Sequence, residues 1–234
     1  MKRRFDPQEL ELMDRPQPVS AELESDLANL RQLNRFFGSH ALISKFLRRW
    51  VKTGDRLRIV DLATGSGDIP RLVVDHARRI GAQISVDAID GQAATLEIAR
   101  RLSAGYPEIS FHCGDIRTWG TVKAYDIVLC SLVLHHFSER DAVTVLQHGR
   151  ELSRGRILVS DLRRGYLASA GVFLLTAILF RDPMTKFDGR MSAARAFSFS
   201  ELRELAKHAG WRNFGHAKFK FARQAIWAEE TTVP

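Results

Sequence analysis

The sequence has few cysteines, no apolar stretch near its first residues and no run of about 20 apolar residues, the length that a membrane span needs. Its two cysteines, Cys113 and Cys130, lack the spacing of metal ligands and adjoin predicted buried strands. We therefore expect both to be small core residues in a reducing cytoplasm, and we expect no bound metal. Without an apolar leader, secretion is disfavoured and a cytoplasmic location is expected.

A continuous basic tract is also missing, although the formal net charge is +8. The excess comes from arginine pairs scattered along the chain, which is typical of solvated helix surfaces, and no RNA-binding module is recognisable. This pattern disfavours nucleic acid as a partner, and it indicates no particular oligomeric state. A length of 234 residues with 45% hydrophobic content is typical of one α/β domain with additions.

A glycine-containing turn at residues 58–70 is the most informative feature that is present. A short apolar strand ends at Asp61, passes through Gly65 and Gly67, and enters a helix whose predicted N-cap is Asp68. In α/β sheets such a turn after a buried strand binds nucleotides, although it can also join strand to helix without a ligand.

The residues around the turn narrow the choice of ligand. No Lys follows Gly67 within reach, which excludes a nucleoside-triphosphate loop. Pro70 stands at the third glycine of the dinucleotide pattern, so that interpretation is weak. Asp61 would repel a pyrophosphate, whereas it would attract a ligand that carries an ammonium and a sulfonium.

Acids also follow the next two predicted strands. Asp90 ends the first of these with Gly91 behind it, and an acid there can accept both hydroxyls of a ribose. Asp115 and Ile116 leave the second, where a carboxylate beside an apolar side chain suits an adenine. Acids at successive strand ends, each before a helix-like segment, predict one ligand site.

A fourth predicted strand at residues 125–131 runs into a loop that carries His135 and His136. Taken together, these segments resemble the class I S-adenosylmethionine-dependent methyltransferases over about residues 55–165. The turn is similar to the first motif of the quinone-biosynthesis C-methyltransferases, with Ala63 in place of the usual first glycine. Those enzymes carry Arg-Asn where this chain has its two histidines.

The resemblance implies an α/β, Rossmann-like fold with a seven-stranded, mostly parallel sheet and helices on both faces. It also implies N-terminal helices and an apolar helix inserted after the fifth strand. The implied cofactor is S-adenosylmethionine, with S-adenosylhomocysteine as the product. The implied cofactor-binding residues are Asp61, Ala63, Gly65, Gly67, Asp90, Gly91, Asp115, Ile116 and Ser131.

Two additions to the core bear on the substrate. Leucines at helical spacing over residues 21–37 predict a helix, and we expect a helical cap over residues 1–54 before a methyltransferase domain over 55–234. A pocket insertion is expected at about residues 163–198, with the uncharged segment 167–180 lining an apolar pocket. The candidate substrate-binding residues are Asn34, Phe36, Arg163, Asp188 and Arg195.

Methyl transfer to oxygen needs a base, because a phenol with a pKa of about 10 is mostly neutral at pH 7. Histidine is suited to that task, so His135 is the candidate base and His136 the alternative. The sequence thus favours O-methylation of a small, largely apolar or aromatic acceptor at a phenolic hydroxyl. The alternatives are C-methylation of a quinol or polyketide ring, a non-catalytic cofactor-binding protein and, more distantly, a nicotinamide oxidoreductase.

Overall fold

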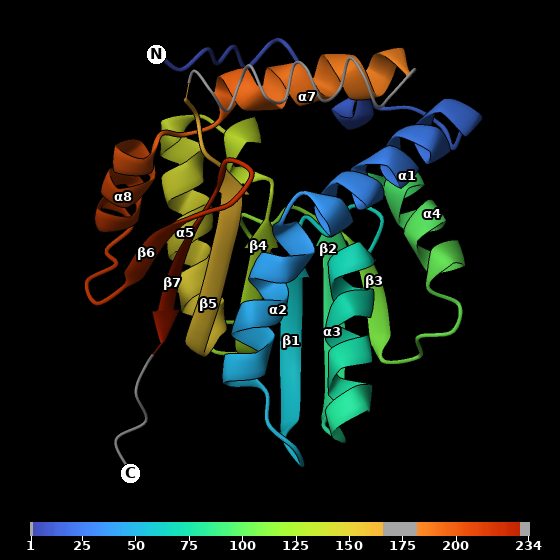
Figure 1. Ribbon diagram of the computed structural model, residues 1–234, viewed down its shortest axis with the longest axis vertical. Helices are drawn as coiled ribbons and strands as arrows, with labels where there is room; N and C mark the ends of the chain where they lie inside the picture. Colours follow the sequence, from blue (N-terminus) through green and yellow to red (C-terminus); the bar gives the residue numbers. More distant parts are fainter. Residues whose placement is uncertain (1, 166–181, 230–234) are drawn as a thin grey trace.

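The computed structural model describes residues 2–165 and 182–229, which form a seven-stranded sheet (Figure 1). The strand order is β3-β2-β1-β4-β5-β7-β6. Strands β1 to β5 are parallel, and β7 lies antiparallel to both β5 and β6. This sheet confirms the predicted Rossmann-like fold class. The strands are β1 (Arg56–Leu62), β2 (Gln83–Asp90), β3 (Ile109–Cys113), β4 (Tyr125–Ser131), β5 (Ser153–Leu162), β6 (Gly215–Phe219) and β7 (Arg223–Glu229).

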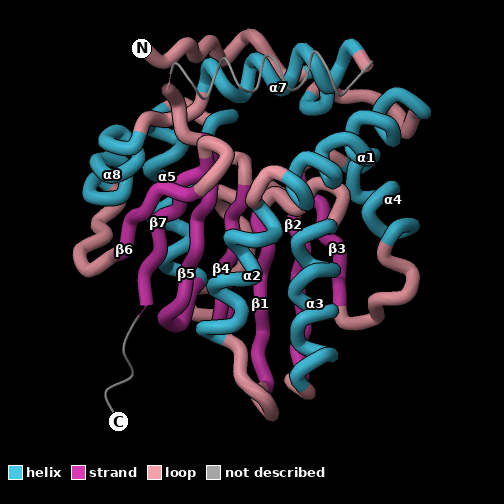
Figure 2. Tube along the Cα trace, in the orientation of Figure 1, coloured by secondary structure: helices cyan, strands magenta, loops and turns pink. Residues whose placement is uncertain are grey.

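Helices cover both faces of the sheet (Figures 1 and 2). They are α1 (Ala21–Phe36), α2 (Ser39–Trp50), α3 (Asp68–Ile80), α4 (Ala93–Leu102), α5 (Glu139–Leu152), α7 (Pro183–Arg195) and α8 (Phe199–His208), with short 3-10 turns η1 (Leu12–Asp14) and η2 (Leu134–His136). Successive strand residues face opposite sides. Ile59 and Ile127 pack with α2 and α3, whereas Val60 and Val128 pack with α5 and α8.

The N-terminal segment, α1 and α7 lie across the carboxyl ends of the parallel strands and form a roof there (Figures 1 and 2). The buried carboxylate of Asp188 in α7 accepts hydrogen bonds from the N–H groups of Leu12 (2.7 Å) and Met13 (3.0 Å). The hydroxyl of Thr185, also in α7, donates to Asp26 of α1 at 2.7 Å. Because buried polar groups are stable only when they are hydrogen-bonded, these contacts fix the position of α7 relative to α1 and the N-terminal segment.

The two helices of the predicted N-terminal cap, α1 and α2, pack against different parts of the structure. The Phe46 ring of α2 packs on Trp227 of β7, with ring centroids 5.0 Å apart. Helix α2 is therefore part of the layer on the sheet, and the segment before it lies over the strand ends. The division of the chain at residue 54 stays a prediction.

Two local predictions are wrong. Gly67, with its left-handed backbone, is the N-cap of α3 in place of Asp68. The Asp68 carboxylate instead accepts a hydrogen bond from the Asn34 amide at 3.1 Å and lies 2.8 Å from Nε2 of His40, which ties α1 and α2 to the glycine turn. Cys113 is exposed because it ends β3, an edge strand, whereas Cys130 is buried as predicted.

The predicted pocket insertion is described in part. Its uncharged segment at 167–180 lies outside the described residues, whereas α7 belongs to the roof. Within the ranges 2–165 and 182–229, no helix is long and apolar enough to cross a bilayer.

Candidate active site

A cavity of about 870 Å³ lies between the carboxyl ends of the strands and the roof. Its floor is built by the segments that follow β1, β2, β3 and β4, and its walls include leucines of α1 and the turn between β6 and β7. Most of the lining is apolar. Pockets for small ligands measure about 300–1,000 Å³, so this one has room for a cofactor and a second small molecule.

The glycine turn after β1 forms part of the floor. Ala63, Gly65 and Gly67 all have left-handed backbones, with φ of 59°, 54° and 73°. No heavy atom lies within 4 Å of where a Cβ on Gly65 would be, and this residue lines the cavity, so a ligand can approach its main chain. Gly67 does not line the cavity; a Cβ there would meet the Phe111 ring at 3.1 Å.

Three carboxylates crowd the floor beside this turn. Burial raises the pKa of Asp61 to about 8, and the charges of Asp68 and Asp90 contribute to the rise. Burial also raises the pKa of Asp90, although its carboxylate accepts hydrogen bonds from the N–H groups of Gly65 (2.8 Å) and Gln92 (3.0 Å). A cationic ligand would relieve the repulsion that helps to raise the pKa of Asp61, so the floor suits an ammonium or a sulfonium.

The other predicted cofactor residues border the same cavity. Gly91, Ile116 and Ser131 line it, and so does Asp115. The Asp115 carboxylate accepts hydrogen bonds from the Arg117 side chain, which are the main cause of its lowered pKa. The structure thus brings together, around one cavity, all the predicted cofactor-binding residues except Gly67.

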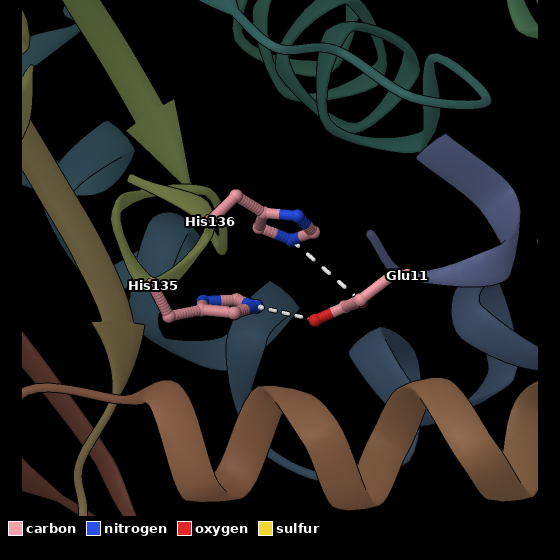
Figure 3. Close-up of side chains that lie close together, drawn as sticks. All are labelled: Glu11, His135 and His136. Atoms are coloured by element: carbon pink, nitrogen blue, oxygen red, sulfur yellow. Dashed lines mark ion pairs between the residues drawn. The ribbon is translucent and has the colours of Figure 1, made fainter. Parts of the chain in front are cut away.

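His135 and His136 project from η2, directly after β4, and their rings lie 4.3 Å apart (Figure 3). The buried carboxylate of Asp161 accepts the His135 main-chain N–H at 3.0 Å and lies 2.6 Å from Nδ1 of that ring. Nδ1 of His136 lies 2.5 Å from an oxygen of Asp14. Burial disfavours a charged His136 ring, but the carboxylates of Glu11 and Asp14 outweigh it and raise the His136 pKa to about 10.

The five candidate substrate residues have different surroundings. Asn34 lines the cavity, whereas Phe36 is 63% exposed and does not. Asp188 and Arg195 are buried in α7, where Asp188 holds η1 and Arg195 donates to main-chain carbonyls of the N-terminal segment. The main-chain N–H of Arg163 pairs with the turn between β6 and β7, and its side chain does not line the cavity.

Sequence reasoning missed Glu11, Asp14 and Asp161 as site residues. Asp161 lies near the end of β5, after an apolar run. The same pattern marked Asp61 and Asp90, so Asp161 could have been predicted as a site residue. Glu11 and Asp14 carry no such signal, because the roof brings them to the histidines from more than 120 residues away in the sequence.

Comparison with known proteins agrees with this geometry. Residues 59–154 match the methyltransferase domain family. A stretch of 79 residues is 38% identical to the 2-phytyl-1,4-naphtoquinone methyltransferase of Thermosynechococcus vestitus. It covers 34% of this chain and 34% of that protein, so the match spans about a third of the relative's length.

Solved structures share the fold over most of the chain. A SAM-dependent methyltransferase from Aquifex aeolicus has a TM-score of 0.61 at 16% identity, covering 96% of this chain and 98% of that one. The plantazolicin methyltransferase BpumL, in complex with SAH, has a TM-score of 0.65 at 14% identity, covering 91% of each chain. The family match shows a methyltransferase domain over residues 59–154, and the solved structures show that the fold around it is shared with these methyltransferases.

Binding of S-adenosylhomocysteine, which carries an ammonium, is expected to release a proton from Asp61. With a pKa of about 8, this carboxyl is mostly protonated at pH 6–7, and a neighbouring ammonium favours its ionised form. Affinity should therefore rise with pH, by up to about tenfold per unit between about pH 6 and about pH 7.5. Calorimetry in two buffers of different ionisation enthalpy counts the proton.

The Asp61→Asn variant is the matched control, because its amide has the same size and does not titrate. Its affinity should be lower at about pH 7.5 and nearly independent of pH. A parent protein that binds equally well across this range would contradict the role assigned to Asp61.

The Asp90→Ala variant should bind S-adenosylhomocysteine at least about tenfold more weakly. We expect Asp90 to accept the ribose hydroxyls, and a hydrogen bond to a charged group contributes about 1.5–3 kcal/mol. Calorimetry gives the affinity, and a melting curve checks that the turn at Gly65 still folds. Glu204→Ala, which removes an exposed carboxylate of α8, should leave binding unchanged. Equal affinity in the parent and the Asp90→Ala variant would refute the assignment.

Proposed function

We propose that this protein transfers the methyl group of S-adenosylmethionine to a small, largely apolar or aromatic acceptor at a phenolic hydroxyl. One observation carries the proposal: a single cavity is lined by the acid-bearing glycine turn and by the histidine pair, and most of its remaining wall is apolar. The turn suits a cationic cofactor, and the walls suit a greasy or aromatic second ligand.

The residues of the floor match the parts of the cofactor. Asp61 would face the ammonium, Gly65 leaves space for the ligand's approach, Asp90 would accept the ribose hydroxyls, and Asp115 with Ile116 would border the adenine. The cofactor supplies a methyl group that is already activated on sulfur. The protein's part is then placement, because holding the two reactants in line supplies much of the rate.

An acceptor hydroxyl beside η2 would lose its proton at the histidine pair. Because a carboxylate only accepts hydrogen bonds, Asp161 indicates a hydrogen on Nδ1 of His135 and leaves Nε2 as the acceptor. His135 is therefore our candidate base when no cation is bound, and His136 is the alternative.

C-methylation is the second candidate, favoured by the curated relative that methylates a naphthoquinone according to its name. The same base would deprotonate the hydroxyl that activates the ring, and the methyl group would bond to a ring carbon. A panel of naphthoquinols, catechols and alkylphenols, with release of S-adenosylhomocysteine as the readout, tests the activity. Mass spectrometry and NMR of the product place the methyl group on oxygen or on carbon.

Replacing His135 by Ala should lower turnover about 10²–10⁴-fold with the best acceptor, because a group that removes the acceptor's proton contributes that much, and His136→Ala should show this loss instead if His136 is the base. Affinity for S-adenosylhomocysteine should change little, since neither ring is expected to contact that ligand's charged groups. The control is His208→Ala, an exposed histidine of α8. If both variants retain the parental turnover, the histidines are structural and proximity alone drives the reaction.

A further inference from the structure

Glu11, His135 and His136 meet at the acceptor end of the cavity, where all three line the wall (Figure 3). Nε2 of His135 lies 4.0 Å from one oxygen of Glu11, and Nε2 of His136 lies 3.8 Å from the other. Both separations are longer than a hydrogen bond, although Glu11 and His135 are almost fully buried. The three side chains therefore face one another without bonding directly.

These separations suit three ligands of one metal ion. Two ligand atoms that each lie about 2.1 Å from an ion are about 3–4 Å apart, depending on the angle between them. One nitrogen or oxygen atom from each of the three residues can be chosen so that all lie within 4.8 Å of one another. Two histidines and one carboxylate are the ligand set of several zinc and non-haem iron sites.

The surroundings of the cluster have the outer hydrogen bonds that support metal ligands. Nδ1 of His135 lies 2.6 Å from Asp161 and Nδ1 of His136 lies 2.5 Å from Asp14, so each Nε2 is turned toward Glu11. The Ser192 hydroxyl donates to Glu11 at 2.8 Å. A carboxylate on the second nitrogen of each ring orients a histidine and increases its basicity toward a metal.

Charge favours a cation at the same place. Glu11, Asp14 and Asp161 surround the two rings, and burial together with the charges of Glu11 and Asp26 raises the pKa of Asp188 to about 7. Two arginines of the roof, Arg3 and Arg195, donate to main-chain carbonyls, and those of His135 and Phe137 accept from Arg3.

We propose that Glu11, His135 and His136 bind one divalent transition-metal ion such as Zn²⁺, which leaves coordination positions open toward the cavity. This departs from the expectation, based on the cysteines, that the protein binds no metal. It deepens the proposed function and rests on it for the role of the ion. A hydroxyl of the acceptor would take an open position, as would a second oxygen in an acceptor with adjacent oxygens.

The ion changes how the acceptor is activated. A bound Zn²⁺ lowers the pKa of its water to about 7, and it acts in the same way on a phenol. The hydroxyl proton passes to solvent, the oxygen forms a bond to the methyl carbon, and the bond from that carbon to sulfur breaks with its electron pair left on sulfur. Both histidines then act as ligands, and neither accepts the proton.

The test is direct metal binding by the full chain after dialysis against a chelator. Titration with Zn²⁺ alone in a calorimeter should give one equivalent bound, and Co²⁺ should give the visible spectrum of a site with nitrogen and oxygen ligands. Glu11→Gln, His135→Ala and His136→Ala should each weaken Zn²⁺ binding at least about 100-fold. Asp14→Asn, which alters an outer partner, should weaken it about 10–100-fold.

The control variant is His112→Ala, which removes a histidine paired with Asp87 outside the cavity and should leave Zn²⁺ affinity unchanged. Binding of S-adenosylhomocysteine by each variant confirms that it has folded. Failure of the parent to bind stoichiometric Zn²⁺, or unchanged affinity in the Glu11→Gln and His135→Ala variants, would overturn the proposal. Turnover that survives the chelator would do the same while leaving the methyltransferase function intact. A metal-binding protein without methyl transfer would instead count against the proposed function.

Discussion

The hydrogen bonds that Leu12 and Met13 donate to the buried carboxylate of Asp188 hold the N-terminal segment over the carboxyl ends of the strands. That contact places the neighbouring Glu11 and Asp14 beside the histidines that follow β4. The segments that follow the parallel strands are enough to form the floor of the cavity. The wall of the cavity beside the histidines exists because the N-terminal segment is hydrogen-bonded to α7.

The crowded acids beside the glycine turn reduce the stability of the free protein when no cation is near. Burial and the charges of Asp68 and Asp90 raise the pKa of Asp61, which is a cost to a folded chain without a cation nearby. A positively charged ligand would offset this repulsion between the carboxylates, and the attraction would contribute to its binding. The same reasoning applies beside η2, where several carboxylates surround two imidazole rings.

Apolar side chains make up most of the cavity wall. Under the proposed function, the leucines of α1 and Phe221 between β6 and β7 would favour an acceptor that is largely hydrocarbon or aromatic. Such an acceptor would present its hydroxyl where the wall is polar, at η2. In the two proposals, a free lone pair on Nε2 lets a histidine accept the hydroxyl proton, whereas a metal ion bound at Nε2 would occupy that lone pair and lower the pKa of the hydroxyl instead.

The sheet and the acid-lined floor of the cavity were predictable from the sequence, because both depend on short-range patterns. An apolar run that ends in an acid, followed by a glycine turn and a helix, is readable within about a dozen residues, and Asp61, Gly65 and Asp90 were found in this way. The wall around the two histidines was not predictable, because it depends on tertiary packing. Glu11 and Asp14 reach His136 through the packing of distant segments, and Asp188 and Arg195 are buried in the contacts that fasten the roof. Their local sequence is the same whether they face a ligand or another part of the chain, because that choice is made by contacts between segments far apart in the sequence.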